Sequence, residues 1–196
     1  MPPRLYREHG LRQDETDGGC WWFSCSGEGR FDLEAPQGTC YLAESEGVAA
    51  RERCGRLMAM NLPIAENIYT GRVVSEVKPP TAIGVVGDLA SPDALTVGVT
   101  AELTATSDYA LCQAWAQQCW DAGFGAIKYA PRFTPGGQEA ALAVFGDAGD
   151  HPAYGIIVRR RALLDVLQEM GTELVRSHEL GAASLDVQDD ADPPAH

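Results

Sequence analysis

Apolar residues along the chain fall into short runs that glycine, proline and charged residues interrupt. The run at 39–43, Thr-Cys-Tyr-Leu-Ala, follows Gly38 and precedes polar residues, a pattern typical of a short buried strand. The same pattern predicts further strands at residues 4–9, 21–23, 70–77, 82–86, 95–99, 124–129, 140–145 and 153–158. The lengths of these runs indicate many short strands.

Two segments have helical periodicity. At 46–60, Val48, Glu52 and Gly55 fall on one side of a helix, and Ser45 is a suitable N-cap. A second helix is predicted at 108–121, where the residues at helical spacing are Tyr109, Cys112, Trp115, Ala116, Cys119 and Trp120.

A third amphipathic helix is expected at 161–170. Because helices and strands alternate irregularly, the pattern favours an α+β fold, with short twisted sheets flanked by helices, over a doubly wound parallel sheet. A chain of 196 residues suits one domain. We expect this domain to span residues 1–184, and the acidic, proline-containing tail at 185–196 to be disordered.

Charge and composition narrow the function classes. The net charge of −13 would repel a nucleic-acid backbone, so general nucleic-acid binding is not expected. No apolar run is long enough to cross a membrane, and the N-terminus lacks the apolar core of a secretion signal. These features predict a cytoplasmic protein.

The six cysteines do not form a metal-binding pattern. There is no CxxC pair, and the four histidines are not at ligand spacing with the cysteines, so no metal site is expected. Cys112 and Cys119 are seven residues apart, which places both on one face of the predicted helix as small apolar side chains.

Residues 20–56 contain three candidates for a ligand pocket. Arg30 follows a glycine turn and could bind a diphosphate, or it could be an exposed loop arginine. Tyr41 lies in an apolar strand, where it could orient a ribose, stack on a base or only pack in the core. Glu52 could stabilise a glycosyl cation, or form a surface ion pair with Arg56.

Other candidates lie outside this stretch. Arg7 and Arg132 could face the pocket from neighbouring strands or be surface residues, and Tyr109 begins the second helix. The basic run at 159–161 is interpreted as the solvated start of the last helix, with a partner contact as the alternative.

These residues, in their order and spacing, resemble the RES domain family, the toxin component of a class of bacterial toxin–antitoxin pairs. The resemblance covers residues 4–160, and its specificity comes from the order of short motifs. The matching pieces are Leu5-Tyr6-Arg7, Gly29-Arg30-Phe31, the run at 38–43, Ala49-Ala50-Arg51-Glu52, Asp108-Tyr109, and the segments 113–116, 123–127 and 143–145.

The resemblance implies an ADP-ribosyltransferase-like fold that binds NAD as substrate and cleaves its nicotinamide–ribose bond. Cleavage would use water, or inorganic phosphate as a co-substrate. By motif, Arg7 and Arg30 would bind phosphates, Tyr41 would position the nicotinamide riboside, and Glu52 would stabilise the ribosyl cation. The family also implies a helix-turn-helix antitoxin as partner, and a homodimer is a further expectation.

The sequence departs from the family at a serine. Ala110 and Pro131 occupy the positions where that serine is expected, and the nearest hydroxyls are those of Thr106 and Ser107. The departure leaves three alternatives: an NAD-degrading toxin, a relative with a different acceptor such as an ADP-ribosyltransferase acting on a macromolecule, or a non-catalytic NAD-binding or interaction module.

Overall fold

The structure is a computed structural model that describes residues 4–11, 19–78, 83–134, 136 and 138–176. The predicted tail at 185–196 and the predicted domain end at residue 184 lie outside these residues.

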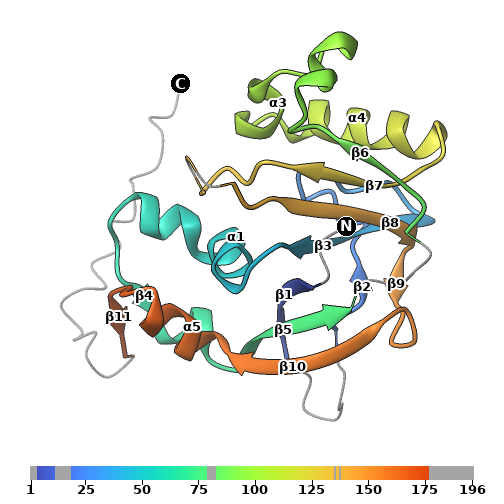
Figure 1. Cartoon of the computed structure of the whole chain (residues 1–196). Coiled ribbons are helices and arrows are strands. Elements are labelled where there is room, and N and C mark those ends of the chain that lie inside the picture. Colours follow the sequence, from blue (N-terminus) through green and yellow to red (C-terminus); the bar gives the residue numbers. More distant parts are fainter. Residues whose placement is uncertain (1–3, 12–18, 79–82, 135, 137, 177–196) are drawn as a thin grey trace, which may run out of the picture.

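The centre of the fold is a seven-stranded sheet with the strand order β10-β5-β1-β3-β8-β7-β6 (Figure 1). Neighbouring strands are antiparallel except β6 and β7, which are parallel. The strands are β1 (Leu5–Gly10), β3 (Gln37–Ala43), β5 (Arg72–Lys78), β6 (Val85–Asp88), β7 (Phe124–Tyr129), β8 (Ala141–Asp147) and β10 (Ile156–Ala162). The α+β architecture predicted from the sequence is confirmed, with one large mixed sheet in place of several short ones.

The sheet is weakest between β1 and β3. These two strands pair at one position, Tyr6 with Ala43, whereas β1 pairs with β5, and β3 with β8, along their whole lengths. The sheet therefore consists of two halves, β10-β5-β1 and β3-β8-β7-β6, which separate beyond this single pairing. Figure 1 shows the two halves with α1 beside the region where they meet.

Three helices bury one face of the sheet in a shared apolar core: α1 (Glu46–Ala59), α4 (Tyr109–Asp121) and α5 (Leu163–Glu169). Both long helices were predicted from periodicity. Ser45 caps α1 as expected, since its hydroxyl accepts a hydrogen bond from the backbone N–H of Val48 at 3.2 Å.

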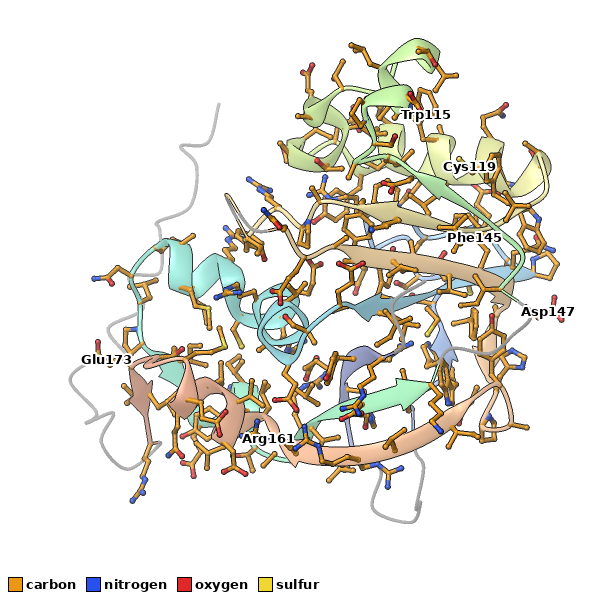
Figure 2. The ribbon with its side chains drawn as sticks, viewed as in Figure 1. Trp115, Cys119, Phe145, Asp147, Arg161 and Glu173 are labelled. Carbon is orange, nitrogen blue, oxygen red and sulfur yellow. The ribbon has the colours of Figure 1, made fainter. Side chains whose placement is uncertain are left out.

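Helix α4 packs on the β7–β8 side of the sheet. Cys112 and Ala116 are fully buried there, and the Trp120 ring meets Phe145 of β8 edge-on at 6.3 Å. Figure 2 shows Trp115 and Cys119 on this helix and Phe145 on the strand below it.

The short elements are α2 (Glu66–Tyr69), α3 (Ala101–Ala105), the 3₁₀ helix η1 (Pro92–Val97), the pair β4 (Ile64–Ala65) with β11 (Leu174–Val175), and the pair β2 (Trp22–Phe23) with β9 (Gly149–Asp150). None of the described helices is long and apolar enough to cross a membrane.

Two sequence predictions were wrong. The strand expected at 95–99 is not formed. Residues 95–97 belong to η1, because Ser91 caps a turn that begins with Pro92, and Leu95 and Val97 are exposed. The basic run at 159–161 does not start a helix. It lies in β10, where the run pairs with β5. Arg161, labelled in Figure 2, lies just before α5 and forms ion pairs with Glu46 and with Glu169 at the end of α5.

Candidate active site

A cleft of about 320 Å³ opens where β1 and β3 separate. This volume is within the range of small-molecule sites, roughly 300–1,000 Å³. The cleft is lined by Tyr6, Arg7, Glu8, Glu28, Gly29, Arg30, Tyr41, Leu42, Ala43, Ala49, Glu52, Arg53, Tyr109 and Tyr129. It brings together five of the six candidates named from the sequence, all except Arg132.

Glu52 reaches the cleft from α1, whose cleft-facing side is formed by Ala49, Glu52 and Arg53 at helical spacing. The Tyr129 hydroxyl lies close enough to the Glu52 carboxylate to act on it as a hydrogen-bond donor. Burial among the cleft walls raises the pKa of Glu52, while the nearby Arg30 charge and the Tyr129 hydrogen bond lower it. The Glu52 side chain as a whole is nevertheless exposed and lines the cleft, so a ligand in the cleft can contact it.

The alternative role for Glu52 was an ion pair with Arg56. Within the described part of the chain, Glu52 forms no such pair, and Arg56 does not line the cleft.

Tyr129 is a site residue that the sequence did not reveal. It is 3% exposed and packs against Phe31, with ring centroids 4.9 Å apart. Burial and the Glu52 carboxylate raise the pKa of Tyr129 well above its ordinary value, which keeps the hydroxyl protonated as a donor. In the sequence, Tyr129 reads only as the last residue of an apolar strand, so no local signal marks it.

Arg30 is half-buried and tethered. Its Nη1 donates to the carbonyl of Thr106 at 2.6 Å, after the end of α3, and its Cζ lies 4.9 Å from the centre of the Tyr109 ring. This stacking is a cation–π contact between the loop and the first residue of α4. The alternative that Arg30 is an exposed loop arginine is therefore excluded. These contacts hold the Arg30 charge near Glu52.

Asp32 holds the loop that carries Arg30. Its Oδ2 accepts hydrogen bonds from the Gly29 N–H at 3.1 Å and from the hydroxyls of Ser24 and Ser26 at 3.0 and 3.2 Å, and its Oδ1 accepts from Tyr41 at 2.9 Å. Asp32 is 3% exposed. This role could not be predicted from the sequence, because Asp32 lies in a segment whose pattern indicates only an acidic loop.

Tyr41 lines the cleft with its ring, while its hydroxyl is engaged by the loop. Besides donating to Asp32, the hydroxyl accepts a hydrogen bond from the Phe31 N–H at 2.9 Å. A Cβ on Gly29 would lie 2.5 Å from the Tyr41 hydroxyl, so this position requires glycine. Gln113 of α4 completes the support by donating to the carbonyl of Gly29 at 2.9 Å.

Arg7 and Glu8 line the cleft from β1. The Arg7 guanidinium donates to the Cys40 sulfur and, at 2.8 Å, to the Trp22 carbonyl, so it extends across the gap between β1 and β3. Glu8 forms a two-point ion pair with Arg72 of β5, with Oε2 3.0 Å from Nη2.

Arg132 is exposed and lies outside the residues that line the cleft. Its guanidinium carbon is 5.5 Å from the centre of the Phe133 ring.

The hydroxyl groups of the described cleft lining all belong to tyrosines, namely Tyr6, Tyr41, Tyr109 and Tyr129. Pro131, Thr106 and Ser107 are not among the lining residues. The described cleft lining therefore combines arginines, glutamates and tyrosines without a serine.

Comparison with known proteins agrees with this architecture. No curated protein matches the chain. Among solved structures, the crystal structure of the M. tuberculosis MbcT-MbcA toxin–antitoxin complex contains a similar chain, with a TM-score of 0.60 at 20% identity over 85% of this chain and 87% of that one. This likeness shows that the two chains share an α+β fold, as expected from the sequence. Residues 4–186 match the RES domain, and the chain therefore belongs to the RES domain family.

Proposed function

We propose that this protein consumes NAD by cleaving the bond between nicotinamide and ribose. The observation that carries the proposal is the convergence of Glu52, Tyr129 and Arg30 in one cleft. A solvent-accessible carboxylate with a fixed hydrogen-bond donor and a neighbouring cation is suited to a reaction in which positive charge develops on a sugar.

The chemistry needs charge stabilisation more than acid catalysis. Nicotinamide leaves as a neutral group, so the ribose becomes cationic as the bond breaks, and a carboxylate held beside it stabilises that charge. Tyr129 fixes the carboxylate in one orientation before the reaction, and Arg30 helps to keep it ionised.

The cleft walls provide the remaining contacts. Tyr41 and Tyr109 present aromatic rings that can pack on the nicotinamide or hold the riboside. Arg7 and Arg30 are the arginines that the family resemblance assigns to phosphates, and both line the cleft. Arg132 lies outside it, so we do not include this residue in the site.

The acceptor of the ribosyl group is water, inorganic phosphate or a macromolecule. Because the lining hydroxyls are all tyrosines, a second candidate function is NAD binding without turnover. Purified protein incubated with NAD in phosphate-containing and phosphate-free buffer, with nicotinamide followed by chromatography, separates these cases. Release in both buffers indicates hydrolysis, and release only with phosphate indicates phosphorolysis. Labelled NAD that marks lysate proteins indicates transfer to a macromolecule.

The variant Glu52→Gln keeps the size of the side chain but removes its charge, and should abolish nicotinamide release. Glu34→Gln is the matched control, because Glu34 is an exposed glutamate outside the cleft lining. NAD binding by calorimetry without nicotinamide release in any buffer would exclude the enzyme and support the binding module. Equal turnover by Glu52→Gln and wild type would remove Glu52 from the mechanism.

We further propose that the protein is the toxin of a cytoplasmic toxin–antitoxin pair with a helix-turn-helix antitoxin. Membership of the RES domain family and the fold shared with a chain of a toxin–antitoxin complex support this. Induced expression in bacteria should deplete NAD and arrest growth, and co-expression with the product of the neighbouring gene should restore growth. Light scattering of the purified protein tests the expected homodimer.

A further inference from the structure

The cleft contains three arginines, and two of them are bound by the protein itself. Arg7 donates to the Cys40 sulfur and the Trp22 carbonyl. Arg30 donates to the Thr106 carbonyl and stacks on Tyr109. A ligand phosphate that engaged the same donors of these side chains would have to displace contacts that hold the cleft walls.

Arg53 differs from both. It is exposed, it lines the cleft, and its side chain forms no hydrogen bond or ion pair with any residue that the structure describes. It follows Glu52 directly and lies four residues after Ala49, so its Cα is on the helix face that meets the cleft. A helical side chain leans toward the N-terminus of its helix, which directs the Arg53 side chain along the Ala49–Glu52 wall.

The charges around the cleft favour this arginine as an anion contact. The lining contains the three glutamates Glu8, Glu28 and Glu52, in a protein whose net charge is −13. Glu8 is neutralised by Arg72, but Glu52 and the exposed Glu28 oppose a negatively charged ligand. A hydrated guanidinium can exchange water for two phosphate oxygens without losing a protein contact.

We propose that Arg53 binds a phosphate group of the ligand at the mouth of the cleft, one residue from the carboxylate that faces the ribose. The proposal rests on the proposed function only in the identity of the ligand. The phosphate is either the diphosphate of the dinucleotide or the inorganic phosphate that would act as acceptor. Both have the same chemistry for a guanidinium, and the experiment separates them.

The test compares Arg53→Gln with Arg56→Gln. Arg56 is an exposed arginine of the same helix, one turn further and outside the cleft lining, so the control removes an equal charge without removing a cleft group. Glutamine has a helix propensity close to that of arginine, so neither change should unfold α1. Each variant is assayed with NAD and with nicotinamide riboside, which contains the same scissile bond but no phosphate.

Arg53→Gln should raise the KM for NAD about tenfold, the loss expected for one charge-assisted contact at an open site. It should leave kcat/KM for nicotinamide riboside unchanged, and Arg56→Gln should change neither value. If the contact is to the acceptor instead, Arg53→Gln raises the KM for inorganic phosphate at saturating NAD and leaves the KM for NAD unaltered. Arg53→Lys should raise the KM less than Arg53→Gln does, since lysine keeps the charge but not the planar fork.

Three results would overturn the proposal: unchanged constants for both NAD and phosphate, an equal loss with nicotinamide riboside at saturating phosphate, or an equal loss with Arg56→Gln. Calorimetry keeps the test independent of turnover. If NAD binds to wild type without being cleaved and binds about tenfold more weakly to Arg53→Gln, the proposed enzyme fails and the Arg53 contact stands. If Arg53→Gln binds and cleaves NAD as wild type does, at every phosphate concentration, the enzyme stands and the contact fails.

Discussion

Replacing Asp32 should destabilise the protein by an amount that depends on which donors are left unpaired. Asp32 is buried and accepts four hydrogen bonds, from Gly29, Tyr41, Ser24 and Ser26. In Asp32→Asn the amide oxygen can still accept from Tyr41, while the amide NH₂ faces the other three donors. The two serine hydroxyls can rotate and accept from it, but the Gly29 N–H cannot.

One orphaned backbone donor costs about 1–3 kcal/mol, so Asp32→Asn should lower the free energy of unfolding by roughly 2 kcal/mol. In Asp32→Ala both the Gly29 N–H and the Tyr41 hydroxyl lose their acceptor. Water can enter from the exposed Ser26 side and recover part of the loss, so we expect about 3 kcal/mol.

Urea unfolding followed by tryptophan fluorescence measures both values, because Trp21 is buried. Asp121→Asn is the matched control. Asp121 is an exposed aspartate whose carboxylate accepts one hydrogen bond, from Gln117, and its replacement should stay within about 0.5 kcal/mol of wild type. If Asp32→Asn were as stable as the control, the four-bond network would not anchor the Arg30 loop.

Three further changes test other parts of the structure. Tyr129→Phe removes a contact that lowers the pKa of Glu52, so the carboxylate should protonate at higher pH. The acid limb of the pH–rate profile for nicotinamide release should therefore move to higher pH. An unmoved limb in the folded variant would contradict the hydrogen bond from Tyr129 to Glu52. Gly55→Ala should lower the free energy of unfolding, measured in urea, by about 1–2 kcal/mol, because the new Cβ would lie 2.5 Å from Phe133. This loss is expected despite the better helix propensity of alanine. A stabilised variant would show that Phe133 moves aside freely. Ser45→Ala should cost about 1 kcal/mol by loss of the α1 cap, and Ser45→Asn should not, because its amide keeps a capping oxygen and an N–H donor for the Glu139 carboxylate that Ser45 contacts at 2.9 Å.

Periodicity was sufficient to predict the elements whose pattern is long or flanked by clear breaks. Helices α1 and α4 and the strands β3 and β7 were found in this way, since capping residues and glycine turns mark their ends. Helix α3 and the 3₁₀ turn were missed because five or six residues are too few to show a 3.6-residue period. The basic run at 159–161 was assigned to a helix because strand pairing with β5, a tertiary contact, decides its conformation.

Five of the residues that line the cleft could be named as candidates from the sequence. Glu52 and Arg30 were named because a glutamate on an inward helix face, and an arginine after a glycine turn, each depart from the ordinary pattern. Tyr129 and Asp32 were missed, because each acts through partners that the local sequence does not reveal. Tyr129 lies 77 positions from Glu52 in the sequence, and the Arg30 bond to Thr106 joins residues 76 apart.

The position of Glu52 links the split sheet to the chemistry. A continuous sheet would fill the space beyond Tyr6 and Ala43 with backbone hydrogen bonds, and α1 would then pack on a closed surface. Because β1 and β3 separate, the same helix face can present a carboxylate to a solvent-filled space. That exposure alone would leave a mobile carboxylate, and burial among the walls makes it easier to protonate. The Tyr129 hydroxyl, at the end of β7, and the Arg30 charge, in the loop before β3, oppose both the mobility of the carboxylate and its protonation. This arrangement supports the proposed function, in which the bound ligand becomes positively charged, since a cleft that only bound an anion would not need Glu52.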